Sequence, residues 1–170
     1  IIDKLHLDLK KKYKNLLTIL IPRHVNRSNE IIDELKTLNL KVLERSAGKK
    51  PNKDCDIYIV DTYGEMSKFL ELSKLTFIGG SMVNHGGQNP LEAVRMGNYI
   101  MHGKKVENFK EIYKELKNLK ISSEVNNLDQ MKNVFSKKFN YKKSRKIINK
   151  IDHIGTKIFK SNIQEIKNYL

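Results

Sequence analysis

The stretch LTFIGGSMVNHGGQNPLEAVRMGNYIM, residues 75–101, contains one complete repeat of an alternating strand and helix pattern. A short apolar run at 75–78 predicts a buried strand, and a polar, glycine-rich loop follows at 79–88. Proline in the first helical position and glycine at the end predict a helix over 90–97. A second apolar run at 99–101 predicts the next strand. A strand, a crossover helix and a strand in this order favour parallel pairing.

The same alternation extends to both sides of this stretch. Further short apolar runs predict strands at 16–21, 40–43 and 57–60. Amphipathic spacing predicts helices at 1–14, 28–38, 66–72 and 107–119, followed by lysine-rich helix from Leu128 to the end. The sequence therefore predicts an α/β fold with one mostly parallel sheet and helices on both of its faces.

Charge is the most unusual feature of the composition. The chain has 33 basic and 19 acidic residues, which gives a net charge of +14 at pH 7. Only five of the basic residues are arginine, the side chain that nucleic-acid contacts prefer. A solvated lysine surface is therefore favoured and no nucleic-acid partner is expected, although a basic nucleic-acid-binding domain stays an alternative. Attraction to an anionic membrane surface also stays open.

Other classes of protein are disfavoured by single residues. The one cysteine, Cys55, allows no internal disulfide and fits a reducing compartment. No apolar run is long enough to cross a bilayer, and no stretch has the order of a secretory signal. His24, His85 and His102 fall in polar loops, but no pair has the short spacing of metal ligands. We therefore expect neither a metal nor a cofactor.

Polar loops follow four of the predicted strands and begin at Pro22, Asp61, Gly79 and His102. Ligands of parallel α/β sheets bind beyond the carboxyl ends of the strands, so these loops are the candidate site. In the first loop, Arg23 can clamp a phosphate through two parallel hydrogen bonds. A surface arginine after a turn is the alternative interpretation, and the signal is weak by itself.

The second loop, VDTYGEM at 60–66, contains a flexible backbone position and an acid. Gly64 allows the backbone to approach a ligand closely, and Glu65 begins the next helix, where backbone N–H groups point outward. Ordinary helix capping explains the acids of this loop equally well.

The third loop is the most informative. Gly79, Gly80 and Ser81 directly follow a strand and can expose consecutive N–H groups as an anion-binding nest. Asn89 and Glu92 flank a helix start whose positive end suits a phosphate. Their spacing is also that of a capping box, which is the structural alternative. The density of glycine favours a binding loop, although the pattern fits neither a Walker loop nor a dinucleotide fingerprint.

Six short motifs in these regions occur in the order and spacing of one known family. They are PRH at 22–24, RSAG at 45–48, DTYGE at 61–65, FIGGS at 77–81, GGQNPLE at 86–92 and NFKE at 108–111. Over about residues 16–120 the chain resembles the C-terminal domain of the bacterial 3-deoxy-D-manno-octulosonic acid (Kdo) transferases of lipopolysaccharide synthesis.

The resemblance implies a Rossmann-like domain, the C-terminal half of a GT-B glycosyltransferase, with CMP-Kdo as its donor ligand. The family's nucleotide-binding positions fall on Pro22, Arg23, Tyr63, Gly64, Glu65, Asn89, Pro90, Leu91 and Glu92. Gly79, Gly80 and Ser81 are expected to hold the donor sugar's carboxylate or the phosphate. The departures from the family pattern are Tyr63 for methionine, Gln88 for histidine and Lys104 for proline.

The resemblance also implies a larger enzyme. Its catalytic base and its surface for the acceptor, a lipid A precursor, are expected in an N-terminal domain, so this fragment by itself is expected to be inactive. The full enzyme would transfer Kdo with inversion and without a metal, at the cytoplasmic face of the bacterial inner membrane. We expect a CMP-Kdo-binding domain at 1–125, lacking the usual first strand, and lysine-rich helices at 126–170. A domain for another nucleotide sugar is the alternative.

Overall fold

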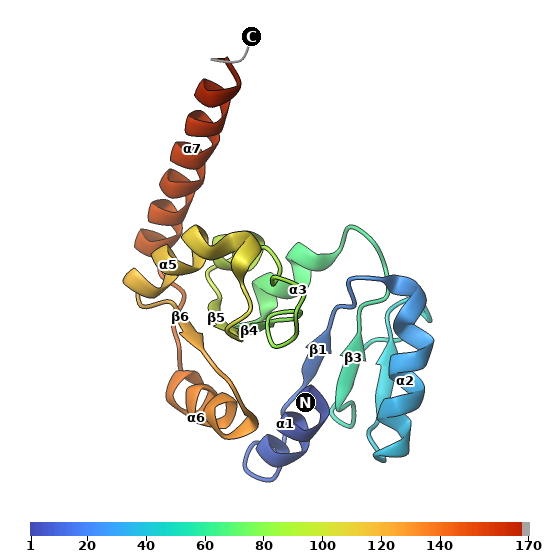
Figure 1. The fold of residues 1–170 in the computed structure, drawn as a ribbon. Coiled ribbons are helices and arrows are strands. Elements are labelled where there is room, and N and C mark those ends of the chain that lie inside the picture. The colour runs from blue at the N-terminus through green and yellow to red at the C-terminus, as the bar shows by residue number, and fades with distance from the viewer. Residues whose placement is uncertain (168–170) are drawn as a thin grey trace. The chain divides into compact units, whose positions relative to one another are not determined.

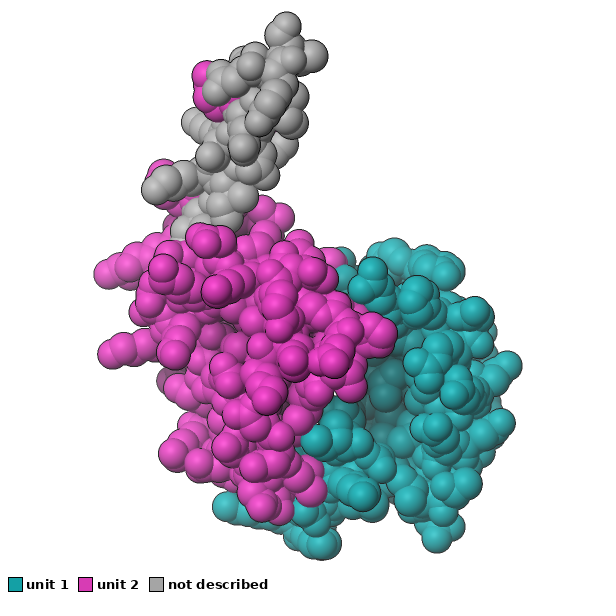
Figure 2. All heavy atoms as spheres, in the orientation of Figure 1, with its two compact units in different colours: residues 1–69 teal, residues 70–170 magenta. Residues whose placement is uncertain are grey.

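A computed structural model describes residues 1–167 and, in the last helix, the side chains of 145–153, 155–156 and 163–164. The chain forms two compact units, unit 1 at 1–69 and unit 2 at 70–170, which Figure 2 shows in teal and magenta. Each unit has its own three-stranded sheet and its own hydrophobic core.

In unit 1 the strands β1, β3 and β2 lie side by side in this order, and both pairs are parallel. Their bounds are β1 Thr18–Leu20, β2 Val42–Glu44 and β3 Ile57–Ile59, and the helices are α1 Ile2–Lys10, a 3₁₀ turn at Val25–Arg27, α2 Ser28–Thr37 and α3 Met66–Leu72, whose last residues enter unit 2. Figure 1 shows α2 alongside these strands, and α2 contacts β2.

The central strand β3 is buried on both faces because its side chains alternate between two cores. Ile57 and Ile59 pack with Ile32 of α2, whereas Tyr58 packs on the opposite side with the partly buried Phe69. All three side chains of β3 are at most 2% exposed. A continuous apolar run therefore forms this strand, as the pattern of a doubly covered parallel sheet requires.

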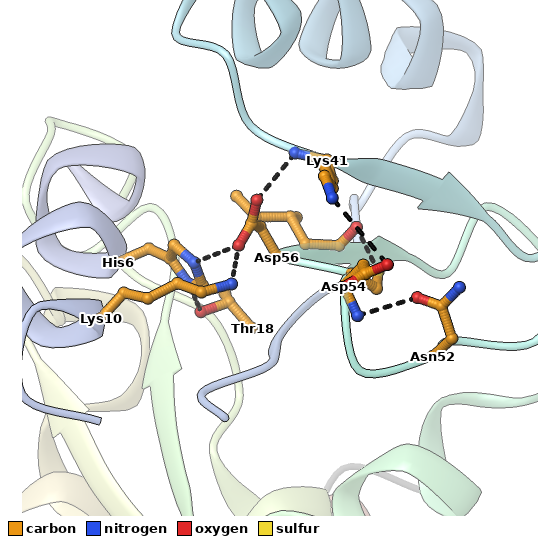
Figure 3. A network of polar contacts seen from close by, with 9 residues as sticks. His6, Lys10, Thr18, Lys41, Asn52, Asp54 and Asp56 are labelled. Atoms are coloured by element: carbon orange, nitrogen blue, oxygen red, sulfur yellow. Dashed lines mark hydrogen bonds and ion pairs between the residues drawn. The ribbon is translucent and has the colours of Figure 1, made fainter. Parts of the chain in front are cut away.

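Polar contacts link α1 to the amino-terminal end of β3 (Figure 3). This polar cluster consists of His6, Lys10, Thr18, Lys41 and Asp56. Lys10 forms an ion pair with Asp56, and the backbone N–H of Lys41 donates to Asp56 Oδ2 at 2.8 Å. His6 is 1% exposed and its Nδ1 lies 2.8 Å from Thr18 Oγ1. Burial, and then the nearby Lys10 charge, lower the pKa of His6 from 6.5 to about 4, so His6 is neutral at pH 7.

In unit 2 the strands lie in the order β4, β5, β6, again with parallel pairs. The bounds are β4 Leu75–Ile78, β5 Tyr99–His102 and β6 Ser122–Glu124, with α4 Leu91–Arg95, a 3₁₀ turn at Glu107–Phe109, α5 Lys110–Asn118, α6 Leu128–Lys138 and α7 Arg145–Lys167. Helix α7 contacts α4, and its Ile151 lies in the same core as Val94 and Leu116. Helix α6 contacts β5 and buries Met131 completely.

The predicted fold class is confirmed, since parallel strands alternate with helices that cover them. Two expectations were wrong in detail. The described strands form two three-stranded sheets in place of one, because the hydrogen-bond ladders join β1 only to β3 and β4 only to β5. Strand β6 was not predicted, because Ser-Ser-Glu lacks the apolar pattern of a strand and is defined by its backbone pairing with β5.

The predicted lysine-rich helices are present as α6 and α7, and residues 168–170 lie outside the described residues. The functional boundary expected at 125–126 stays a prediction, as does the missing first strand. Among the helices that the structure describes, none has both the length and the apolar character that a membrane crossing requires.

Candidate functional site

The carboxyl edge of the unit 1 sheet gathers three charged residues. Because its strands are parallel, the segments that follow them begin at the same edge. Arg23 comes three residues after β1, Arg45 directly after β2, and Glu65 in the loop after β3. The side chain of Arg23 is exposed. Sequence analysis predicted Arg23 and Glu65 at this edge but not Arg45.

Glu65 is held by a planar two-point contact with Arg45. Arg45 Nε donates to Glu65 Oε2 and Nη2 donates to Oε1, both at 2.9 Å. Thr62 Oγ1 donates to Oε2 at 2.7 Å, and Lys68 Nζ lies 3.4 Å from Oε1. The hydrogen bonds from Arg45 and then Thr62 lower the pKa of Glu65 from 4.5 to about 2, so it is ionised at neutral pH.

The rest of the loop after β3 contains one exposed ring and one ordered acid. The ring of Tyr63 is 82% exposed. Gly64 has a φ of +77° and open space where a Cβ would stand, so this position favours glycine because of its backbone conformation and not because of crowding. Asp61 Oδ1 accepts a hydrogen bond from the Ser46 N–H at 2.8 Å. Burial by itself would raise the pKa of the Asp61 carboxyl group. The hydrogen bonds from Ser46 outweigh this effect, and the pKa of Asp61 is lowered.

In unit 2 the loop after β4 is joined to the loop after β5. Ser81 is fully buried; its hydroxyl donates to the Ile78 carbonyl at 2.6 Å and accepts from the Gly103 N–H at 2.8 Å. The Ser81 carbonyl accepts from the Lys105 N–H at 2.8 Å. The Ser81 side chain is therefore committed to the loop itself. Because the whole residue is buried, a ligand contact in this part of the loop is left to the exposed Gly79 and the partly exposed Gly80.

The second glycine pair of this loop is held by the segment that follows β5. Gly86 and Gly87 have φ values of +69° and +74°. The carbonyl of Gly86 accepts from the Asn108 N–H at 3.2 Å, and Tyr113 Oη donates to the Gln88 carbonyl at 2.9 Å. The motifs at 86–92 and 108–111 are thus neighbours in space.

The helix start at 89–92 does not form the capping box that its spacing permits, because the Asn89 side chain bonds two residues along the chain and not to the Glu92 N–H. Asn89 Oδ1 accepts from the Leu91 N–H at 2.9 Å, and α4 begins at Leu91 after Pro90. Glu92 is exposed, and within the described part of the chain its carboxylate has no recorded hydrogen bond or ion pair. Its side chain is consequently accessible to a ligand.

The three histidines predicted in loops do not gather into a metal site, and His102 is the last residue of β5 and not part of a loop. His102 is buried, its Nδ1 lies 2.7 Å from the Gly103 carbonyl, and its ring packs 4.4 Å from that of Tyr113. Burial lowers the pKa of His102. Over residues 1–167, in the parts whose side chains are described, no three His, Cys, Asp or Glu residues are grouped as metal ligands.

Comparison with known proteins identifies relatives of this chain. It is 37% identical to 3-deoxy-D-manno-octulosonic acid transferase from Haemophilus influenzae over 85% of its own length, and 43% identical to that of Rickettsia felis over 56%. The chain is a homologue of the Kdo transferases. It spans 34% of the length of the first relative and 20% of the second. No protein-family model matches.

The fold comparison agrees with this homology to the Kdo transferases. The C-terminal CMP-Kdo binding domain of WaaA from Acinetobacter baumannii superposes with a TM-score of 0.78 over 89% of this chain and 79% of that one, at 22% identity. A bifunctional glycosyltransferase/methyltransferase from Fusobacterium nucleatum is 32% identical over 86% of this chain and 23% of its own length. The predicted family and the predicted fold of its C-terminal domain are confirmed.

The predicted site residues divide between the two units. Pro22, Arg23, Tyr63, Gly64 and Glu65 lie in unit 1, and Gly79, Gly80, Ser81, Asn89, Pro90, Leu91 and Glu92 lie in unit 2. Their assignment to a nucleotide stays a prediction. Arg45 was missed as a site residue, although the RSAG motif that contains it was noticed, because its contact with Glu65 spans 20 positions in the sequence.

Proposed function

We propose that this chain is the donor-binding part of a Kdo transferase and that its ligand is CMP-Kdo. The observation that carries the proposal is the homology to Kdo transferases combined with an exposed Arg23 at the carboxyl edge of a parallel sheet. That edge is where α/β sheets bind their ligands.

Each group in the proposed site has a chemical task. In unit 1 the Arg23 guanidinium suits the phosphate of CMP. In unit 2 the backbone N–H groups at the start of α4 suit an anion, except that of Leu91, which already donates to Asn89. The carboxylates of Glu65 and Glu92 suit ribose hydroxyls, because an ionised carboxylate only accepts hydrogen bonds. Backbone N–H groups of Gly79 and Gly80 suit the carboxylate of Kdo, whereas Ser81 is fully buried and its hydroxyl is bonded to Ile78 and Gly103.

In the full-length enzyme the proposed reaction is a metal-independent transfer with inversion. A hydroxyl of the lipid A precursor attacks the anomeric carbon of Kdo while the bond from that carbon to the CMP phosphate breaks. The proton of the hydroxyl goes to a base outside this chain, and the leaving CMP gains negative charge that Arg23 stabilises. This chain supplies donor binding and stabilisation of the leaving group but not the general base, so we expect that it does not turn over by itself.

The proposed location is the cytoplasmic face of the bacterial inner membrane. The acceptor is a lipid, and the net charge of +14 favours an anionic membrane surface. Sedimentation of the chain with anionic vesicles, at low and at high salt, tests this part separately.

Calorimetric titration with CMP tests donor binding. We expect wild-type chain to bind CMP and Arg23→Ala to weaken binding by about tenfold, since a hydrogen bond to a charged group contributes about 1.5 to 3 kcal/mol. Arg27→Ala is the matched control, because Arg27 is an exposed arginine in the same segment and pairs with Glu30. An Arg23→Ala chain that binds CMP as tightly as wild type would remove the basis of the proposal.

The Fusobacterium nucleatum relative, named only as a glycosyltransferase/methyltransferase, favours a second candidate, a site for another nucleotide sugar. Titration with UMP, GMP and AMP under the same conditions distinguishes the two. Preference for CMP supports the cytidine donor, and preference for another nucleotide replaces it.

A further inference from the structure

We propose that Arg45 is a positioning residue of the nucleotide site, which orients Glu65 and leaves one oxygen of its carboxylate available to a hydroxyl of the ligand. The inference rests on the proposed function, because it needs a nucleotide at Glu65. Arg45 itself is not required to touch the ligand.

The hydrogen bonds around Glu65 use its two oxygens unequally. Oε2 accepts from Arg45 Nε at 2.9 Å and from Thr62 Oγ1 at 2.7 Å, which occupies both of its lone pairs. Oε1 accepts from Arg45 Nη2 at 2.9 Å, and its other neighbour is Lys68 Nζ at 3.4 Å. The Lys68 side chain is 71% exposed and free to turn toward solvent. Oε1 therefore keeps the capacity to accept a hydroxyl.

The guanidinium is positioned by the backbone that carries it. The Arg45 N–H donates to the Ile59 carbonyl at 2.9 Å, which extends the pairing of β2 with β3 by one residue. The next residue, Ser46, donates its N–H to Asp61 at 2.8 Å. These two contacts fix the end of β2 against the segment that leads to Glu65. Arg45 thus reaches Glu65 from a fixed base.

The carboxylate of Glu65 is ionised at neutral pH with or without Arg45, and an ionised carboxylate only accepts hydrogen bonds, so it recognises hydroxyl donors. The fork of Arg45 orients this carboxylate. Lysine in place of Arg45 keeps the charge but cannot make two parallel hydrogen bonds. The expected consequence of the Arg45–Glu65 contact is selectivity for a nucleotide that presents a ribose hydroxyl to Glu65.

The test compares two ligands, CMP and 2′,3′-dideoxy-CMP, by calorimetry with wild type, Arg45→Ala, Arg45→Lys and Glu65→Gln. We expect wild type to prefer CMP by about tenfold or more, because a site that hydrogen-bonds a hydroxyl rejects the analogue that lacks it. Arg45→Ala and Glu65→Gln lose most of this preference but keep the affinity for the dideoxy ligand. Arg45→Lys falls between. Arg27→Ala, which breaks an exposed Arg–Glu pair of the same unit, keeps the full preference.

A second measurement follows the carboxyl carbon of Glu65 by NMR from pH 6 to pH 4. Wild type shows no titration there, whereas in Arg45→Ala the pKa of Glu65 rises toward its ordinary value, although the hydrogen bonds from Thr62 and Lys68 still lower it. An Arg45→Ala chain with wild-type preference for CMP, or with equal loss of both ligands, overturns the positioning role alone. A wild-type chain that binds neither ligand overturns the proposed function and this inference with it.

Discussion

Gly103 lies against the backbone of Ser81 with no space for a side chain. A Cβ at Gly103 would stand 2.3 Å from the Ser81 carbonyl oxygen, and the Gly103 N–H donates to Ser81 Oγ at 2.8 Å. Two loops that are 22 positions apart are therefore locked together at the carboxyl edge of the unit 2 sheet. The glycine-rich loop gains its shape from this contact.

The first prediction concerns this contact. Gly103→Ala should lower the free energy of unfolding by about 2 to 3 kcal/mol, because backbone atoms must move apart to accept the methyl group. Urea unfolding measures the change. Gly79→Ala is the control: it has open space around it and should stay within about 0.5 kcal/mol of wild type. Equal stability of the two variants would contradict the close packing of the loops.

The second prediction separates steric clash from backbone strain. A Cβ at Gly86 would stand 2.4 Å from Asn108 Nδ2, and its φ is +69°. Gly64 has a similar φ of +77° but nothing within 4 Å. Both alanine variants suffer strain of about 1 kcal/mol or more, and Gly86→Ala suffers the clash as well. Introducing Asn108→Ala beside Gly86→Ala should recover part of the loss, which thermal unfolding of the single and double variants measures.

The third prediction uses the polar cluster of Figure 3. Asp56→Asn should destabilise the chain by about 2 kcal/mol, because it removes the charge that pairs with Lys10 and accepts the Lys41 N–H. Asp54→Asn is a matched control two residues away, since Asp54 is 74% exposed and lies 3.9 Å from Lys41 Nζ. Chemical unfolding at pH 7 measures the free energy of unfolding of both variants. Similar decreases in Asp56→Asn and Asp54→Asn would show that the cluster does not stabilise the position of α1.

The fourth prediction concerns acid. The folded state lowers the pKa of His6 from 6.5 to about 4, so the folded chain binds fewer protons at His6 than the unfolded chain does between these values. Stability from this residue is complete above pH 6.5 and is lost as the pH falls toward 4, by about 3 kcal/mol. His6→Gln should flatten this part of the pH profile of urea unfolding, and the exposed His24→Gln should leave it as in wild type. If the stability of His6→Gln depended on pH as steeply as that of wild type, the pH dependence would come from other residues.

Local patterns in the sequence determined the order of strands and helices and the loops that carry the candidate site. A continuous apolar run such as 57–59 forms a buried strand wherever both of its faces are covered, so its neighbours are not needed to recognise it. The glycines at positions 64, 80, 86 and 87 all have positive φ, a backbone conformation that other residues adopt only with strain. These features depend on residues close in the chain, and for that reason the sequence revealed them.

The tertiary structure alone decided which side chains meet. Arg45 binds Glu65 across 20 positions and Gly103 meets Ser81 across 22, and the spacing of residues along a chain does not encode such pairings. Strand β6 exists because its backbone pairs with β5, although its residues are polar. The partners of Glu65 and Ser81 lie on other segments of the sheet edges, and only the pairing of the strands brings those segments together, so no local pattern could identify them.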